Sequence, residues 1–307
     1  MYTDSPAWWL AFLGPRFWPT WLLFGFMRLV IWLPFPWQMA VGNLIGRLSY
    51  RLVRRRRRIA EANIRLCFTD LGTALVDELV KAHFLSVGKG IVETALCWWG
   101  RESQLHRKRI LLGTEHLQRG LAQGKGVILL SAHFTTLELG GRLLALDTPF
   151  HVLYRQHKNP LFETVMRRAR QRRFKKAIPR NNTRVLLASL KDNMPVWYAP
   201  DQNHAGPQAV FVPFFGIPAS TLAATSRIAK ISGAAVVPFF QMRLPGNQGY
   251  LVMLCPALAD FPGHDAETDT ARINRLLETV IREMPEQYLW IHRRFKTRPQ
   301  GEPCPYS

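Results

Sequence analysis

The spacing of hydrophobic residues changes repeatedly along the chain beyond residue 70. Short runs rich in β-branched and aromatic residues predict strands at 126–132, 150–154, 195–199, 209–214, 234–240 and 250–255. Between several of these runs the spacing is that of amphipathic helices, at 113–123, 136–146, 160–176, 183–192, 219–232 and 270–283, and residues 75–99 predict an additional helical layer. This alternation of strand and helix predicts an α/β fold in which helices cover a mixed sheet.

The first fifty residues follow a different pattern. Every residue from 17 to 33 is large and apolar except Pro19, Thr20, Gly25 and Arg28, and six of the ten tryptophans fall before residue 40. Tryptophan prefers the membrane interface, and about 20 apolar residues are needed to cross a bilayer. A stretch of this length that contains an arginine can either span the membrane or lie in its surface. An ordinary buried helix with a solvated basic end is the alternative.

Neither a charged segment before this stretch nor a small-residue cleavage site after it is present, which favours a retained anchor over a removable signal peptide. The 307-residue length suits one α/β domain with an N-terminal extension, and no linker or internal repeat divides the rest. We therefore predict an N-terminal membrane anchor at 1–46 and a catalytic domain at 47–307.

The formal net charge of +20 indicates an anionic partner, which could be nucleic acid or a phosphate-bearing membrane surface. The distribution of the charge along the chain helps to decide between these two. Residues 1–60 hold nine arginines against one aspartate, and residues 151–180 hold ten basic residues against one glutamate. Two local basic patches beside a tryptophan-rich segment favour membrane phospholipid over nucleic acid, since a nucleic-acid-binding module would leave the apolar segment unexplained. The arginines that follow this segment predict that the catalytic domain lies on the cytoplasmic face.

Two candidate catalytic residues, His133 and Glu138, lie directly after the first predicted strand. Residues five apart on a straight helix point about 140° apart, so His133 must precede the helix to reach Glu138. The carboxylate could then orient one imidazole nitrogen while the other faces substrate, and the helix N-terminus would keep the imidazole neutral. On spacing alone, a satisfied surface histidine is the better interpretation. The four cysteines are widely separated without a CxxC pair, which argues against a metal site.

The segment from His133 to Glu138 resembles the His-X4-(Asp/Glu) motif of acyltransferases, and the wider match is to the late, or secondary, acyltransferases of lipid A biosynthesis. Further blocks occur in the order expected for that family: Glu61-Ala-Asn63 to Cys67-Phe68, Gly124-Lys-Gly126-Val-Ile, Tyr154-Arg155 to Lys158-Asn159-Pro160, Ile178-Pro-Arg180, Asp201-Gln202, Pro213-Phe-Phe-Gly216 and Val237-Pro238. The resemblance covers residues 10–295, nearly the whole chain. The Pro-Glu-Gly block of the broader glycerophospholipid acyltransferases is absent, which favours the lipid A branch.

This resemblance implies a glycerolipid-acyltransferase-like fold and an enzyme of the bacterial inner membrane. The enzyme would take a fatty acyl group from acyl carrier protein and place it on a hydroxyl of an acyl chain already carried by a Kdo-bearing lipid A precursor. It implies neither a metal nor a cofactor. His133 and Glu138 would form the general base pair. The candidate substrate-binding residues are Arg155, Lys158, Asn159, Arg180, Asp201 and Gln202, with Arg155 the first choice for a phosphate or a developing oxyanion.

Two other classes of protein keep part of this pattern. A same-fold acyltransferase could act on another glycolipid or phospholipid. A catalytically dead membrane-associated binding protein would need neither His133 nor Glu138.

Overall fold

A computed structural model describes residues 7–306 of the chain. The strands are β1 (Arg109–Leu112), β2 (Val127–Leu130), β3 (His151–Tyr154), β4 (Lys176–Pro179), β5 (Pro195–Tyr198), β6 (Ala209–Phe214), β7 (Ile217–Leu222), β8 (Ala235–Arg243) and β9 (Tyr250–Leu254). The helices are α1 (Trp18–Val30), α2 (Phe35–Leu52), α3 (Arg54–Cys67), α4 (Thr73–Trp99), α5 (Glu102–His106), α6 (Thr114–Leu121), α7 (Leu137–Leu144), α8 (Pro160–Arg173), α9 (Thr183–Lys191), α10 (Ala224–Ser232) and α11 (Ala266–Glu283).

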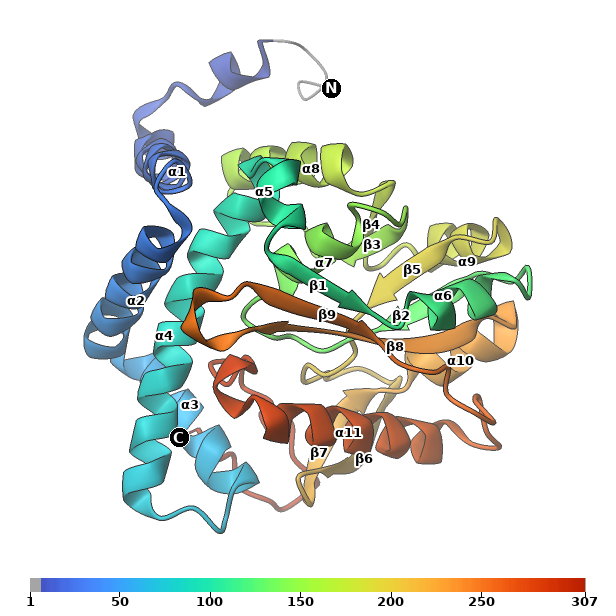
Figure 1. Ribbon diagram of the computed structural model, residues 1–307. Coiled ribbons are helices and arrows are strands. Elements are labelled where there is room, and N and C mark those ends of the chain that lie inside the picture. The colour runs from blue at the N-terminus through green and yellow to red at the C-terminus, as the bar shows by residue number, and fades with distance from the viewer. Residues whose placement is uncertain (1–6, 307) are drawn as a thin grey trace.

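Seven strands form one mixed sheet in the order β1-β9-β8-β2-β5-β3-β4. All neighbouring pairs run parallel except β8 and β9, which are antiparallel. Strands β6 and β7 form a separate hairpin. Helices α5, α7 and α8 lie on one side of the sheet, and α11 lies with the hairpin on the other (Figure 1). The predicted mixed sheet covered by helices is confirmed.

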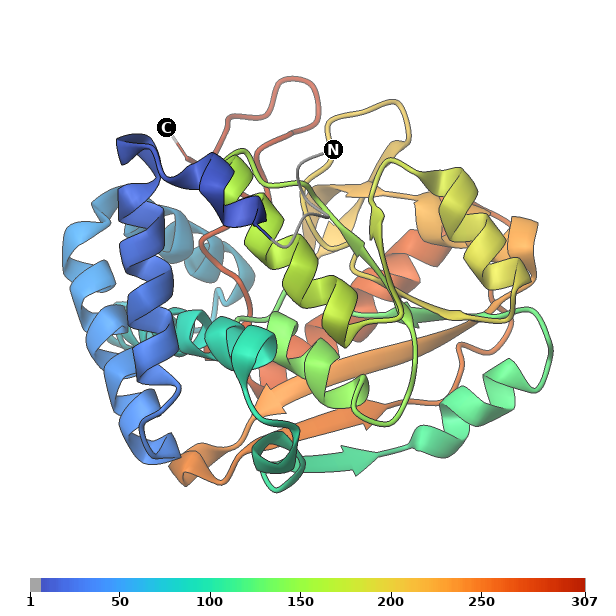
Figure 2. The ribbon, with the colours of Figure 1, turned by 90° about the horizontal axis from the view of Figure 1, so that it is seen from above.

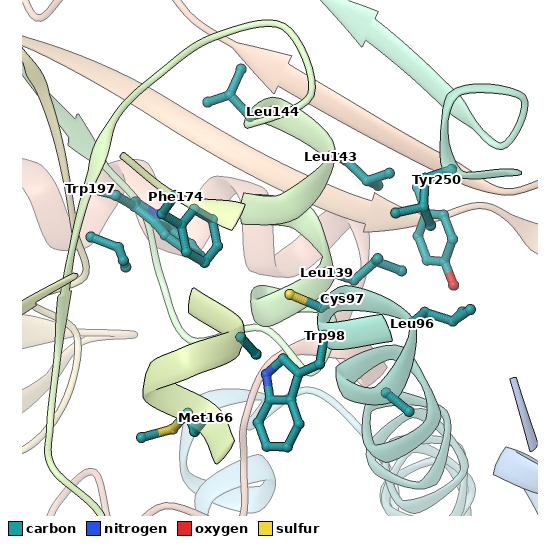
Figure 3. Close-up of a cluster of buried hydrophobic side chains, with 14 of the residues drawn as sticks. Leu96, Cys97, Trp98, Leu139, Leu143, Leu144, Met166, Phe174, Trp197 and Tyr250 are labelled. Carbon is teal, nitrogen blue, oxygen red and sulfur yellow. The ribbon is translucent and has the colours of Figure 1, made fainter. Parts of the chain in front are cut away.

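Strand β2 is apolar throughout because both of its faces are covered, as is usual for parallel strands. Val127 and Leu129 point into a core shared with α4, α7 and α8, whereas Ile128 and Leu130 point into a second core shared with α9, α10 and α11. Figure 3 shows part of the first core, where Leu139 of α7 lies near Cys97 and Trp98 at the end of α4. Strand β2, which leads directly to His133, is therefore held from both sides.

The N-terminal helices form a layer along the long helix α4 (Figures 1 and 2). Helices α2 and α4 approach closely because glycines lie at their contact: a Cβ atom on Gly88 would lie 2.1 Å from the carbonyl oxygen of Gly42. Helix α1 reaches the other end of α4, where Phe24 packs against Trp98 and Trp99 with ring centroids 6.1 and 6.0 Å away. The apolar N-terminal segment is thus packed against the long helix α4.

Some sequence predictions need correction. Residues 219–222, predicted as the start of a helix, belong to β7, and α10 begins only at Ala224. Lys176, predicted as helical, begins β4, and strands β1, β4 and β7 were not predicted. The predicted anchor at 1–46 includes residues 1–6, which lie outside the described part of the chain. Within residues 7–306, none of the helices has the length and apolar character needed to cross a membrane.

Candidate active site

Four polar side chains follow the carboxyl ends of four adjacent parallel strands. His133 lies three residues after β2 and Asp201 three residues after β5, while Arg155 and Arg180 come directly after β3 and β4. Leu130 of β2 pairs with Tyr198 of β5, so the same register carried three residues further brings His133 beside Asp201. The carboxyl edge of an open α/β sheet is the usual place for a binding site.

His133 and Asp201 form a close pair. The Nδ1 atom of His133 lies 2.6 Å from Oδ1 of Asp201, and the backbone N–H of His133 donates to Oδ2 at 2.9 Å. Burial opposes ionisation of Asp201, but the charge of His133 and these hydrogen bonds lower the pKa of the carboxyl to about 2. Burial likewise opposes the imidazolium, yet Asp201 raises the pKa of His133 above its ordinary value. The ring nitrogen left for substrate is Nε2.

The turn that carries His133 is held by a distant segment of the chain. The backbone N–H of Leu289 donates to the carbonyl of His133 at 2.9 Å, and the N–H of Thr135 donates to the carbonyl of Gln287 at 2.7 Å. The hydroxyls of Ser86 on α4 and Thr135 are 2.6 Å apart. Backbone and side-chain bonds from two other elements therefore fix the position of the imidazole before substrate binds.

Glu138 has a different partner from the one predicted. Two N–H groups of Arg170 on α8 donate to its carboxylate, at 2.9 and 2.6 Å, and the indole N–H of Trp98 donates at 3.2 Å. Burial opposes ionisation of Glu138, but Arg170 lowers the pKa of this carboxyl below its ordinary value. Glu138 is therefore an ionised group locked in a two-point ion pair.

These contacts correct the proposed base pair. His133 does precede the helix that carries Glu138, as predicted, but Asp201 orients it. The expected lowering of the pKa of His133 is also wrong in sign, because the charge of Asp201 and its hydrogen bond outweigh the opposing effect of burial. Asp201, assigned from the sequence to substrate binding, is instead buried behind the imidazole, with 1% of its side chain exposed.

Sequence reasoning also missed Arg170. It lies in the basic stretch of α8, where neighbouring arginines such as Arg172 are exposed, but its side chain is only 14% exposed. The available signal was the spacing: Arg170 follows the buried Met166 by one helical turn and so shares its inward face.

A cavity of about 920 Å³ opens in front of these two ion pairs. His133, Glu138, Arg170, Arg155, Arg180 and Gln202 line it, so the structure brings together most of the predicted residues. Apolar side chains of α9 and α10 line another part: Leu186, Leu187, Ile228 and Ile231. One cavity thus offers a base, cationic groups and an apolar wall.

Two predicted binding residues are placed elsewhere. Neither Lys158 nor Asn159 is among the described residues that line the cavity. The side chain of Asn159 caps α8 by accepting from the N–H groups of Leu161 and Phe162 at 3.0 and 3.2 Å, and it donates to Thr20 of α1 at 2.9 Å. Across residues 7–306, no three His, Cys, Asp or Glu side chains are grouped as they would be around a metal ion.

The site at this sheet edge combines a histidine held by an aspartate, several arginines and an apolar wall. These features suit the transfer of a group between substrates that carry apolar chains. Residues 9–297 match the family described as bacterial lipid A biosynthesis acyltransferase, and the chain belongs to that family.

Relatives match over nearly their whole lengths. The chain is 38% identical to the lipid A biosynthesis lauroyltransferase of Escherichia coli strain K12, over 99% of this chain and 100% of the relative. It is 37% identical to the lipid A biosynthesis palmitoleoyltransferase of the same organism, over 96% of each chain. The lipid A biosynthesis myristoyltransferase of that organism is 26% identical, over 97% of this chain and 93% of the relative.

Proposed function

We propose that the protein transfers a fatty acyl group from acyl carrier protein to the hydroxyl of an acyl chain on a Kdo-bearing lipid A precursor. The observation that carries this proposal is the His133–Asp201 pair, which faces a cavity with both cationic and apolar walls. An acceptor with phosphates, sugar carboxylates and acyl chains needs both kinds of wall. The family and its relatives support lipid A as the acceptor class.

His133 acts as the general base. Its Nε2 takes the proton of the acceptor hydroxyl as the hydroxyl oxygen attacks the thioester carbonyl, while Asp201 holds Nδ1–H and stabilises the imidazolium. The tetrahedral intermediate then collapses, the carbon–sulfur bond breaks, and the thiolate takes a proton from the imidazolium. An ester and a free thiol result, and no covalent enzyme intermediate is required.

The Glu138–Arg170 pair supplies fixed charge beside the base. Two of the N–H groups of Arg170 are bonded to Glu138, which leaves other guanidinium N–H groups for a ligand in the cavity. A guanidinium held in advance can stabilise the oxyanion without reorganising. Arg155 and Arg180, at the same sheet edge, are placed to bind phosphate or carboxylate groups of the acceptor.

We infer that the N-terminal helices hold this site at the membrane surface. Large exposed hydrophobic side chains are concentrated in helices α1 and α2 and the connection between them: Trp18, Leu22, Leu29, Trp32, Trp37, Leu44 and Leu48 are each at least 46% exposed. A concentration of exposed apolar side chains of this kind is typical of an interaction site, and its tryptophans suit a bilayer interface. We place the protein at the cytoplasmic face of the bacterial inner membrane, beside its phospholipids.

The first prediction tests the base. His133→Ala should lower kcat by about 10²–10⁴-fold, the usual contribution of a general base. The measurement is acyl transfer by purified protein from fatty acyl carrier protein to a defined Kdo-bearing precursor. His264→Ala, at an exposed loop position, is the matched control and should keep normal turnover. Near-normal turnover of His133→Ala would exclude this mechanism.

The acceptor is tested in cells. Mass spectrometry of lipid A from a strain that lacks the gene should show the loss of one secondary acyl chain. Unchanged lipid A with altered phospholipid or other glycolipid acylation would instead assign the enzyme to another acceptor.

A further inference from the structure

A second cavity, of about 460 Å³, lies away from the candidate active site and shares no lining residue with it. The connection between α1 and α2 forms one wall, and the end of α4 with the start of α5 forms the other. The cavity is lined by Arg28, Ile31, Trp32, Leu33, Trp99, Gly100, Arg101, Ser103, Gln104 and Arg107. It joins two segments about 70 residues apart in the sequence at the edge of the N-terminal helical layer.

Three arginines converge on this cavity without an acidic partner. Arg28, Arg101 and Arg107 are exposed, and none of them forms an ion pair with a carboxylate among residues 7–306. The nearest carboxylate in sequence, Glu102, is bound instead by Arg142 at 2.5 Å and Arg173 at 3.3 Å. Three like charges around one hollow favour a bound anion, and guanidinium groups suit phosphate.

The arrangement also holds the guanidinium of Arg28 in place. Its Cζ atom lies 5.3 Å from the ring centroid of Trp99, in a cation–π contact. Ser103 and Gln104 add neutral polar groups to the lining. The cavity is thus a hollow with polar and positively charged lining residues, one of which is held in place, beside exposed apolar side chains.

That surrounding surface identifies the source of the anion. Trp32 is 76% exposed and Leu33 38% exposed, and both line the mouth of the cavity. Leu29, one turn before, is 61% exposed. If these side chains enter a bilayer, the cavity beside them lies at the depth of the lipid phosphates, where tryptophan is usually found.

We propose that this cavity binds the phosphate of an anionic phospholipid and so fixes the orientation of the protein on the membrane. The proposal rests on the membrane-surface attachment included in the proposed function. It adds a specific headgroup site to that attachment. The apolar side chains provide attachment to any bilayer, whereas Arg28, Arg101 and Arg107 provide preference for anionic lipid.

The test compares full-length purified protein binding to two kinds of vesicle, pure phosphatidylcholine and phosphatidylcholine containing phosphatidylglycerol. The variant Arg28→Gln/Arg101→Gln/Arg107→Gln should bind neutral vesicles like the wild type. On anionic vesicles it should lose roughly 100-fold in affinity at low salt, since each of the three basic residues near the surface contributes about fivefold.

A matched control removes the same charge elsewhere. Arg119, Lys191 and Lys230 are exposed, line neither cavity, and lie on α6, α9 and α10, on the side away from α1 and α2 (Figure 1). The variant Arg119→Gln/Lys191→Gln/Lys230→Gln should keep most of the preference for anionic vesicles. Equal losses in the two variants would show general charge attraction and overturn the headgroup site.

Other outcomes separate the two proposals. Failure of the wild type to bind neutral vesicles would overturn attachment through the apolar surface, whatever the arginines do. Binding of the wild type to both kinds of vesicle with equal affinity would leave that attachment in place and overturn the headgroup site.

Discussion

At the scale of single residues, the pairing of His133 with Asp201 determines both the orientation and the charge of the imidazole that we propose as the base. Only neutral imidazole can accept a proton, and the raised pKa of His133 means that this form is reached at a higher pH than for an isolated histidine. The benefit is a stronger base with a fixed tautomer. The cost is reduced activity under mildly acidic conditions.

Asp201→Asn should separate the effect of Asp201 on the pKa of His133 from its effect on the rate. Without the charge of Asp201, burial alone acts on His133 and lowers its pKa, so the acidic limb of the kcat/KM profile should move to lower pH. The plateau value should fall by about 10²-fold or more, because the amide no longer stabilises the imidazolium. A pH–rate profile of the purified enzyme measures both.

Asp192→Asn, at an exposed position at the end of α9, is the control and should leave the profile unchanged. An acidic limb that stays in place in Asp201→Asn would mean that His133 is not the titrating base.

At the scale of elements, a buried ion pair joins α4 to the sheet behind the active site. Arg243 on β8 donates to both oxygens of Glu93, at 2.6 and 2.8 Å, and Tyr250 on β9 donates at 2.9 Å. Arg243 also donates to the hydroxyl of Ser86 at 3.0 Å, and Ser86 bonds the turn that carries His133. The pair therefore connects sheet, helix and catalytic turn.

Arg243→Met should lower the free energy of unfolding by roughly 3–5 kcal/mol, because Glu93 is 1% exposed and would be left as a buried, unpaired charge. Glu93→Leu combined with Arg243→Met removes both charges and should recover much of that loss. Denaturant unfolding of the two variants measures the difference. If the double variant is no more stable than Arg243→Met, the penalty does not come from the unpaired carboxylate.

The order of most elements could be predicted from the sequence because hydrophobic spacing is local. Strand β2 can be predicted because its residues are apolar on both faces. Helix α11 can be predicted because its buried residues recur at regular helical spacing. Strand β4 was missed because it is a short edge strand that continues a basic helix. Strand β7 was missed because small residues such as Ala219 and Ser220 carry no clear period.

The partners within the site could not be predicted in the same way. His133 and Asp201 are 68 residues apart, and Glu138 and Arg170 are 32 apart. Whether these residues come into contact depends on the order of strands in the sheet, and that order could not be predicted from this sequence alone. The position of each residue after a strand or on a helix was visible, but not the partner that each would find.

At the scale of the whole molecule, apolar exposure is concentrated on the N-terminal layer, although other parts of the surface also expose single large hydrophobic residues. Helix α1 turns Phe24 and Met27 inward and leaves Leu22 and Leu29 outward, at 75% and 61% exposure. Phe24 packs on Trp98, whose indole bonds Glu138, so this layer is connected to the wall of the candidate active site through one side chain. Attachment through the layer would hold the cavity close to the lipid surface.

The last prediction concerns this attachment. In fractionated cells the protein should stay with membranes through a high-salt wash and leave in detergent, because apolar burial does not depend on ionic strength.

Leu22→Ser/Leu29→Ser/Leu48→Ser should weaken binding to neutral vesicles by roughly 100-fold, counting about 1 kcal/mol for each partly inserted leucine. Leu75→Ser/Ile110→Ser/Leu112→Ser changes residues that are 50–52% exposed outside the layer, and it should bind normally. Equal weakening in both variants would mean that the layer has no special role, and release of the wild type by salt alone would assign attachment to charge.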